Sequence, residues 1–505
     1  MDRRSVRSLF VPDARGRFLG ARWVYLRALG VIHFSVFYSL AFQIRGLIGD
    51  RGILPVSELF AYLGQHVGAR RYWLVPSLLW LAPNDAGLAA LVLVGLVASM
   101  LLVLNVAPRA CLVVCGVLFV SFVTAAQDFS SYQSEGMLLE ATAVAFVIAP
   151  RGLRPGLAAT RPASWAGRFL VTWECFRIYF ESGVAKLASG DPSWRDLTAM
   201  DHYYENGPLP TWIGWWAQQL PHGFHAFTAL ATLLIELLLI FGVFFGRRVR
   251  LATFCLLTTL QIGIIATSNY CFLNYLVLCL GFFLVDDDAI ERVLRRRLPR
   301  PEPLEPHRVR VWAAAGWLTL LFYSSLAVFA FEGAPEPISY LAGPADLLAH
   351  LRLANRYGLF ARMTNVRYEI QFEGSLDGET YVPYRFRYKP QALDEAPGIF
   401  APYQPRFEWN LWFCAIYEEG VRPRSVVAVA RETCPWVIRG EIRLLERSPD
   451  VLRLFRDDPF AGRAPKYVRA ELYRYWMTDP KTLRATGRWW RRERIATYID
   501  EAFDP

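Results

Sequence analysis

The chain has 505 residues, of which 54% are hydrophobic and 20% are charged, and its mean hydropathy is +0.23. The apolar residues fall in long runs, so the composition excludes a water-soluble globule of this size and predicts a protein that crosses a membrane several times. The formal net charge of +10 requires no nucleic-acid partner. The basic residues gather between the apolar runs and in RWWRRER near the carboxyl terminus.

Nine apolar runs are candidates for membrane-spanning helices. They cover residues 23–44, 87–106, 109–127, 136–149, 166–184, 224–246, 249–268, 271–285 and 309–331. The fourth and eighth runs are only about fifteen residues long, which also suits a re-entrant or interfacial helix. We therefore expect a polytopic helical bundle with eight or nine spans. The basic stretch at 1–22 has no small-residue cleavage site before the first run, and we expect it to remain as a cytoplasmic arm.

The distribution of arginine predicts which connections lie inside the cell. With nine spans and an internal amino terminus, the internal connections are 107–108, 150–165, 247–248 and 286–308, which carry or border most of the arginine clusters between the runs. This bias agrees with the positive-inside rule. The polar loop 185–223 and everything after about residue 332 then lie together on the opposite side.

We therefore predict two domains. Residues 1–335 form a transmembrane helical domain with an ordered extracytoplasmic loop at 185–223, and residues 336–505 form an extracytoplasmic α+β domain. The expected location is the bacterial inner membrane for a prokaryotic protein, or the endoplasmic reticulum membrane for a eukaryotic one. The second domain would be periplasmic or lumenal.

The pattern after the ninth run is that of a soluble α+β domain. Large apolar and polar side chains alternate on both sides of Asp377-Gly378, which predicts a β-hairpin. Phe407–Tyr417 and Trp436–Leu445 are predicted helices, and Tyr467–Met477 is a predicted strand.

The fifth apolar run contains ionisable residues that are costly inside a membrane. Glu174, Arg177 and Glu181 have spacings that place them on one helical stripe, and Lys186 follows near the end of the run. Two interpretations stay open, a polar cavity that opens outward and a structural charge ladder. Glu140 and Glu236 in other runs are possible partners. A lysine acts as a base only when its pKa is lowered, and carboxylates near it in the sequence have the opposite effect.

The sequence lacks the motifs of common cofactor and metal sites. Its eight cysteines form no CxxC pair and no zinc spacing, and there is no GxSxG, P-loop, HExxH or dinucleotide fingerprint. We expect no metal and no cofactor. Cys414 and Cys434 could form a disulfide in an oxidising compartment. The alternative is that Cys414, which lies in a predicted apolar helix, is a core thiol.

Several segments resemble the lipase maturation factor family. They are GVAKL from Gly183, WRDLTAMDHYYE from Trp194, SNYCFLNYLVLCLGFFLVDDD from Ser268, NRYGLFARMTNVRYEIQFEGS from Asn355, FRYKP from Phe386, PYQPRFEWNLWFCAI from Pro402 and GRWWRRE from Gly487. The resemblance implies a multi-pass protein in a lipid bilayer that helps a secreted, lipase-like client to reach its active fold, and whose tail domain contacts that client. It favours a non-enzymatic role. The Arg-, Ala- and Leu-rich composition suggests a bacterial source, for which a lipase client does not follow.

The resemblance also suggests which residues form the contact surface. They are Trp194, Arg195, Asp196, Asp201, Tyr204 and Glu205 in the loop, and Asn355, Tyr357, Arg406, Trp409 and Trp412 in the tail. Each has a structural alternative, because aromatic residues also form interfacial belts and Trp409 with Trp412 has the spacing of a core helix face.

The first run, GLIGDRGILP and the GVAKL element are also similar to the vitamin K-dependent gamma-carboxylase and its bacterial relatives. By position, this similarity makes Lys186 a catalytic base, with Glu181 or His202 as further proton-transfer groups. An integral-membrane enzyme is therefore the alternative function. A transporter is disfavoured because no inverted repeat is visible.

Overall fold

The computed structural model describes residues 18–130, 132–157, 163–299, 308–331, 341–416 and 434–501. The predicted boundary at 335/336 and most of the predicted cytoplasmic arm lie outside these residues. The amino-terminal helices are α2 (Leu19–Ile48), α3 (Val56–His66), α4 (Arg71–Leu74), α5 (Asp85–Val103), α6 (Pro108–Ala125), α7 (Gln133–Ile148), α8 (Trp165–Ala188), α9 (Ala199–Asn206), α10 (Trp212–Gln218) and α11 (His222–Leu237). The later helices are α12 (Arg247–Thr267), α13 (Leu273–Gly281), α14 (Asp287–Leu294), α15 (Arg308–Phe331), α16 (Gly343–Ala349), α17 (Arg406–Phe413), α19 (Trp436–Leu445), α20 (Pro449–Leu452) and α21 (Pro480–Thr486).

All nine apolar runs are helical, and six of these helices are long and apolar enough to cross a membrane. These six are α2, α5, α6, α11 with its 3₁₀ extension to Phe244, α12 and α15. The predicted eight or nine spans are therefore not confirmed. Helix α7 has 16 residues, and α13 with its extension covers only Leu273–Leu284. At a rise of 1.5 Å per residue, both are shorter than the hydrocarbon core of a bilayer, which is about 30 Å thick. Helix α8 has 24 residues, but its ionisable side chains make it too polar to qualify.

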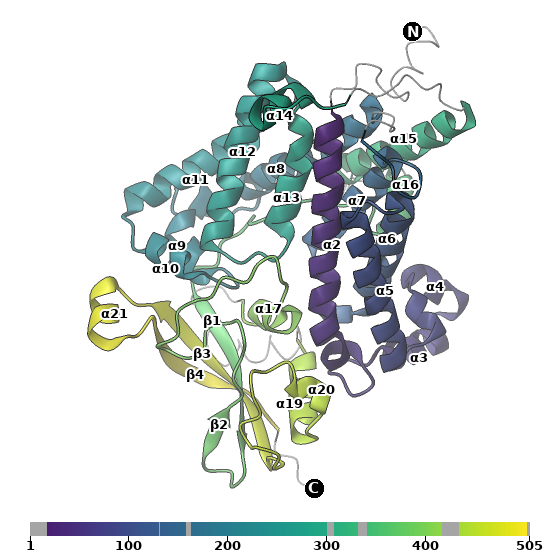
Figure 1. Cartoon of the computed structure of the whole chain (residues 1–505). Coiled ribbons are helices and arrows are strands. Elements are labelled where there is room, and N and C mark those ends of the chain that lie inside the picture. Colours follow the sequence, from purple (N-terminus) through teal and green to yellow (C-terminus); the bar gives the residue numbers. More distant parts are fainter. Residues whose placement is uncertain are drawn as a thin grey trace.

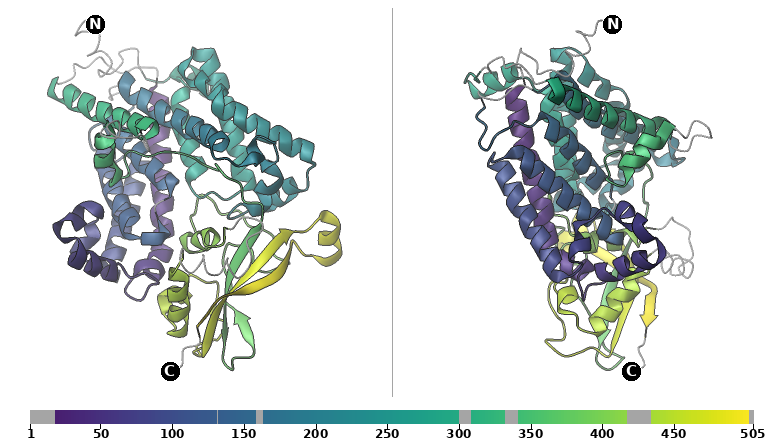
Figure 2. Two further views of the ribbon diagram at one scale, coloured as in Figure 1. Left: turned by 180° about the vertical axis from the view of Figure 1, so that it is seen from behind. Right: turned by 90° about the vertical axis from the view of Figure 1, so that its right-hand side faces the viewer.

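The connections alternate between two ends of the bundle. At one end, Asp286 accepts hydrogen bonds from Arg247, and the backbone N–H of Ala107 bonds to the carbonyl of Leu153. At the other end, Pro210 bridges to Ser268. In Figure 1, α14 lies at the first end and the β-sheet at the second. Both views in Figure 2 show α15 strongly inclined relative to α2.

The described residues of the carboxyl-terminal part form an antiparallel sheet in the order β2-β1-β3-β4. The strands are β1 (Arg367–Ser375), β2 (Tyr381–Pro383), β3 (Tyr467–Met477) and β4 (Trp490–Glu501). The predicted hairpin is present as β1–β2, the predicted strand is β3, and the two predicted helices are α17 and α19, except that Tyr417 lies outside the described residues. Strand β4 was not predicted, because the charged run RWWRRER hides its alternation.

The sheet and the bundle share one hydrophobic core. Phe372 of β1 stacks against Phe407 of α17, at 6.2 Å between ring centroids, and both belong to the same buried cluster as Leu40 of α2. Helix α20 packs directly on α2, where a Cβ on Gly46 would lie 2.5 Å from the carbonyl oxygen of Asp450. This close approach requires glycine at position 46.

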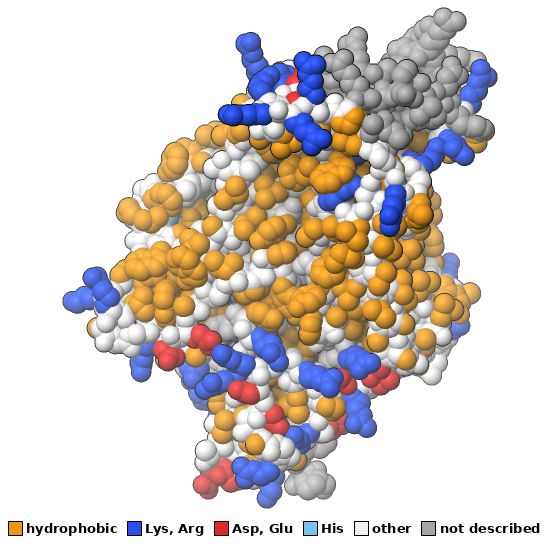
Figure 3. Space-filling model, in the orientation of Figure 1, with side chains coloured by type: hydrophobic (Ala, Val, Ile, Leu, Met, Phe, Trp, Pro, Cys, Tyr) orange, Lys and Arg blue, Asp and Glu red, His pale blue; other side chains and the backbone are white. Residues whose placement is uncertain are grey.

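Figure 3 shows how side chains divide over one face of the molecule. Hydrophobic side chains cover the helical part, whereas charged side chains gather over the sheet and, at the opposite end, over α14. An apolar belt between two charged ends is the surface expected of a protein held in a bilayer.

Candidate functional site

A short segment before β1 connects the soluble part to the bundle. We call residues 355–363 the strap. Its backbone groups bond to side chains of the bundle: the N–H of Tyr357 donates to Glu181 at 2.7 Å and the N–H of Leu359 to Ser182 at 3.2 Å. The N–H of Gly358 donates to Gln133 at 3.1 Å. Segments without regular structure need such partners when they are buried, so the bundle replaces the missing sheet or helix bonds of the strap.

The polar stripe of α8 is a closed ion network. Arg177 bonds Glu181 at 2.8 Å and Glu140 of α7 at 2.6 Å, and it also donates to the carbonyl of Asn355. The hydroxyl of Tyr357 completes the network on Glu140 at 2.7 Å. The predicted partnership of Arg177 with Glu181 is therefore present. Glu174 is buried on the same helix, but no ion pair joins it to Arg177 in the described structure.

Lys186 forms a second closed contact. Its ammonium group lies 2.9 and 2.8 Å from the two carboxylate oxygens of Glu236 in α11, and 3.0 Å from the carbonyl oxygen of Leu359. It also lies 5.0 Å from the centroid of the Trp194 ring. These contacts occupy its three N–H donors. Lys186 is therefore placed as a strap anchor and not as a free base.

The loop after α8 holds the far end of the strap. The indole N–H of Trp194 donates to the carbonyl of Phe360 at 2.9 Å, and Asp191 accepts the N–H of Met363 at 2.6 Å. Burial acts to raise the pKa of Asp191, but hydrogen bonds from Ser193 and Met363 outweigh it and hold that pKa below its usual value. Asp191 thus stays ionised and keeps the loop and strap together.

A cavity of about 1460 Å³ lies beside the strap, between the bundle and α17. Aromatic residues form much of its wall, supplied by the segments just before α7 and α13, by α9 and α17, and by the strap. They are Tyr132, Tyr203, Tyr270, Phe360, Trp409, Trp412 and Phe413. Large concave sites with apolar walls and a few polar groups are typical of binding sites.

Several polar atoms of cavity residues are buried without a hydrogen-bond partner in the described part of the chain. Besides the hydroxyls of Tyr132 and Tyr270, they are the amide oxygens Asn206 Oδ1 and Gln404 Oε1 and the indole nitrogen Trp409 Nε1. The orientation of Asn206 is fixed, because its Nδ2 donates to the carbonyl of Thr364 at 2.8 Å. Buried polar groups are normally paired, so these unpaired groups mark the wall of the cavity as a candidate binding surface.

The structure does not bring the proposed catalytic groups together. His202 lines the cavity, whereas Lys186 and Glu181 do not. Each of those two is bonded within its own network. The residues that the enzyme hypothesis requires therefore share no pocket.

The remaining loop residues lie in several environments. Arg195 and Asp196 are exposed, and Arg195 donates to the carbonyl of Leu187 at 2.7 Å. Asp201 contacts the imidazoles of His222 and His225, while Tyr204 is buried beside His225. These residues do not form one continuous surface.

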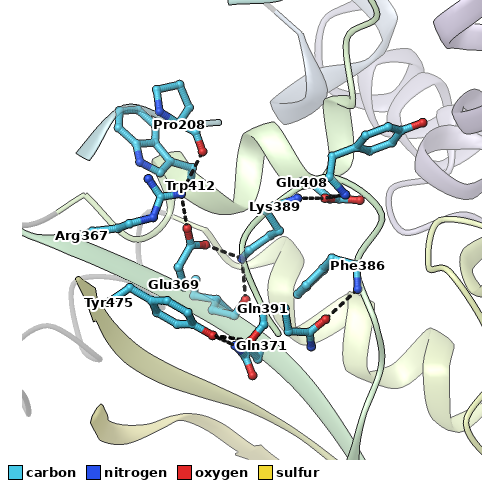
Figure 4. Close-up of polar contacts among 12 residues, drawn as sticks. Pro208, Arg367, Glu369, Gln371, Phe386, Lys389, Gln391, Glu408, Trp412 and Tyr475 are labelled. Carbon is cyan, nitrogen blue, oxygen red and sulfur yellow. Dashed lines mark hydrogen bonds and ion pairs between the residues drawn. The ribbon is translucent and has the colours of Figure 1, made fainter. Parts of the chain in front are cut away.

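Another buried network fixes the loop to the sheet (Figure 4). Arg367 donates to the carbonyl oxygen of Pro208 at 3.1 Å and pairs with Glu369 at 2.5 Å. It also donates to the carbonyl oxygen of Glu205 at 2.9 Å. Glu369 also pairs with Lys389 at 2.8 Å. The side chain of Glu205 accepts the N–H of Met477 at 2.7 Å, so Glu205 serves the junction of loop and sheet.

Helix α17 is held at both ends. Arg406 is buried and pairs with Glu135 of α7 at 2.5 Å. At the other end, a disulfide joins Cys414 to Cys434, just before α19. Trp409 and Trp412 lie between these anchors and face the cavity. Of the predicted contact residues in the tail, these two line the cavity, while Asn355, Tyr357 and Arg406 support its walls.

Sequence reasoning missed other cavity residues, including Tyr132, Asn206, Tyr270 and Gln404. They come from four separate segments, so no local spacing could reveal them. The segments that carry the family resemblance contain two of the four, Tyr270 and Gln404, and that was the available signal.

The fold and the site define a multi-pass membrane protein with an aromatic cavity between its helical bundle and an α+β domain. Two family profiles match this chain: the lipase maturation factor transmembrane domain over residues 20–292 and the lipase maturation factor C-terminal domain over residues 353–500. The chain belongs to the lipase maturation factor family.

Curated relatives match along nearly the whole chain. Lipase maturation factor 2 of Gallus gallus is 30% identical over 95% of this chain and 80% of its own length. Lipase maturation factor 1 of Bos taurus is 30% identical, with 96% of this chain and 89% of its own length covered. Lipase maturation factor 1 of Homo sapiens is 30% identical, with coverages of 96% and 88%. No solved structure matches this chain.

Proposed function

We propose that this protein is a maturation factor that holds a partly folded secreted protein, of which a lipase is the model client, in the cavity beside the strap. The names of the relatives support a lipase client, and the cavity supplies a place to hold one. The observation that carries the proposal is the combination of aromatic walls with the unpaired polar atoms of Asn206, Gln404 and Trp409.

An extended polypeptide fits this combination chemically. Its N–H groups would donate to the amide oxygens of Asn206 and Gln404, and a carbonyl would accept from the indole of Trp409. Its apolar side chains would pack on the aromatic rings, which supply much of the binding energy at protein interfaces. A folded protein hides such segments, so the site would release its client once folding is complete.

The proposed orientation places this cavity outside the cytoplasm. The arginine-rich connections gather at the end of the bundle opposite the sheet, which supports an internal location for that end. All nine helical runs would then cross the bilayer, with α7, α8 and α13 shielded by longer helices. Residues 1–335 form the membrane domain and residues 336–505 the outer domain, which is periplasmic in a bacterium and lumenal in the endoplasmic reticulum.

The residues that contact the client would be Trp409 and Trp412. The other predicted contact residues would act indirectly, with Trp194, Asn355 and Tyr357 fixing the strap and Glu205 and Arg406 fixing the domain. Arg195, Asp196, Asp201 and Tyr204 would lie away from the client.

A photo-crosslinking amino acid at position 412 tests the proposal in cells that secrete a lipase. We expect a crosslink to newly made lipase from position 412 and none from position 216, a tryptophan on α10 that is 47% exposed. Trp409→Ala should weaken capture by about 2 kcal/mol, as for a binding hot spot, and lower the yield of active lipase.

Trp409→Phe keeps an aromatic ring but removes the pyrrole part of the indole with its N–H donor, so it should produce a smaller loss than Trp409→Ala. Full lipase activity in Trp409→Ala, without a crosslink from position 412, would contradict the proposal.

A further inference from the structure

The connection between β3 and β4 carries an exposed basic group that the cavity does not use. We call residues 474–491 the basic hairpin; it includes α21. It contains five basic residues and one acidic residue. The acidic residue, Asp479, caps α21 by accepting the N–H groups of Lys481 at 2.8 Å and Thr482 at 3.0 Å.

The basic side chains are available for a partner. Lys481, Arg484, Arg488 and Arg491 are exposed, and no ion pair holds any of them in the described structure. Arg491 and Arg474 lie on the ring of Trp476, at 4.6 and 4.7 Å from its centroid. This stacking holds positive charge in place on the outer surface of the hairpin.

The basic hairpin is fixed beside α10. The indole N–H of Trp215 donates to the carbonyl of Trp489 at 3.1 Å, and the two rings lie 5.0 Å apart. Gln219 donates to the carbonyl of Thr478 at 3.1 Å. The hairpin therefore has a defined height relative to the bundle.

Helix α10 marks the edge of the apolar belt. Trp212 and Trp216 lie one turn apart and are 45% and 47% exposed. They continue into the exposed apolar residues Leu220, just before α11, and Phe224 and Phe227 in its first turns. Exposed tryptophans beside an apolar helix surface are typical of the interface between lipid tails and head groups.

Figure 3 shows basic side chains at the left edge of the molecule, directly below the hydrophobic surface, where Figure 1 places α21. We infer that the basic hairpin binds the anionic head groups of the adjacent membrane leaflet and so holds the sheet against the lipid surface. Its charge is complementary to those head groups, and its surface continues the apolar belt. This inference does not depend on the client or on the cavity.

A depth-sensitive label tests the inference in the full chain. Cys255 is the exposed free cysteine among the described residues, so the label is attached at Ala485→Cys in a Cys255→Ser background. The protein is placed in nanodiscs of phosphatidylcholine alone or with phosphatidylglycerol, and head-group spin-labelled lipid quenches the fluorescence. We expect stronger quenching with phosphatidylglycerol, and a decline of this difference at high salt.

Charge reversal provides the decisive comparison. Arg484→Glu/Arg488→Glu should abolish the effect of phosphatidylglycerol, because each basic residue near an anionic surface contributes about fivefold in affinity. The matched control Arg463→Glu/Lys466→Glu reverses two exposed charges just before β3, at the end of the sheet away from α10, and should retain the effect.

Equal quenching in both lipid mixtures, or equal loss in test and control variants, would overturn the inference. It would also be overturned if Arg484→Glu/Arg488→Glu left the lipid effect intact and instead reduced crosslinking to lipase, since the hairpin would then be a protein-binding surface.

Discussion

The polar groups on the two sides of the strap differ in whether they have hydrogen-bond partners. On the side of the bundle, the charged groups of Arg177, Glu181 and Lys186 are bonded to one another or to the backbone of the strap. On the side of the cavity, Trp409 and Asn206 line the aromatic wall, and their atoms Nε1 and Oδ1 have no hydrogen-bond partner among the described residues. Satisfied polar groups stabilise one arrangement, whereas unsatisfied ones are available to a ligand. We therefore assign a structural role to the charged groups and a binding role to the aromatic wall.

Removing Arg177 should have the largest effect. Arg177→Leu leaves Glu140 and Glu181 buried without their cation, and breaking a buried ion pair costs about 3–5 kcal/mol. We expect a large fall in thermal stability of the purified protein, measured by intrinsic fluorescence in detergent. Arg195→Leu, at an exposed position, should change stability by less than about 0.5 kcal/mol. Equal melting midpoints for the two variants would show that the buried network of Arg177 does not stabilise the protein more than an exposed arginine does.

Variants of Lys186 distinguish a structural role of this residue from a catalytic one. Lys186→Met strands one carboxylate, Glu236, so we expect a loss smaller than that of Arg177→Leu. The double variant Lys186→Met/Glu236→Leu should recover most of the stability, because replacing both partners of a buried pair with apolar residues is close to neutral. Secreted lipase activity should recover with it. A double variant that is stable but inactive would restore the enzyme hypothesis.

Gly136 tests how closely the strap must approach α7. A Cβ at this position would lie 2.2 Å from Asn355 Oδ1, so Gly136→Ala should cost about 1–3 kcal/mol through overpacking. Gly223→Ala is the matched control, because no atom lies within 4 Å of a Cβ there. Chemical denaturation of both variants measures the difference. An equal loss in both would mean that the strap does not pack closely in solution.

The raised pKa of Glu408 predicts a modest dependence of stability on pH. Burial raises its pKa from 4.5 to about 7, although three backbone N–H groups from Arg387 to Lys389 oppose this shift. The folded state therefore binds more protons than the unfolded state between these two values. The free energy of unfolding should be highest below about pH 4.5 and fall as the pH rises towards 7.

Melting midpoints at pH 5 and pH 7.5 measure this effect. The decrease should be smaller in Glu408→Gln, which cannot titrate. Glu446→Gln, an exposed carboxylate that pairs with Arg443, should behave like the unaltered protein. An unchanged pH dependence in Glu408→Gln would show that another group is responsible.

The sequence predicted the fold elements that depend on local pattern. Apolar runs predicted all nine helices, and alternation predicted the β1–β2 hairpin and β3, because these periodicities follow from helix and strand geometry. The number of spans was less predictable. Whether α7, α8 and α13 cross a bilayer depends on how neighbouring helices shield them from lipid. A hydropathy window covers a single segment and carries no information about these neighbours.

The candidate site was only partly predictable. The ionisable residues of α8 stood out because charge is rare in apolar helices, and Glu140 and Glu236 were possible partners. That Lys186 would anchor Leu359 could not be inferred, because the two residues are 173 positions apart.

The strap also imposes an order of assembly. Its backbone partners on α8 precede it by 176 and 177 residues, and chains are made from the amino terminus onward. When the strap emerges, the side chains of Glu181 and Ser182 are already in place to receive it. A bundle that inserts wrongly offers no such template, so the outer domain would stay undocked and recognisable as defective before any client meets it.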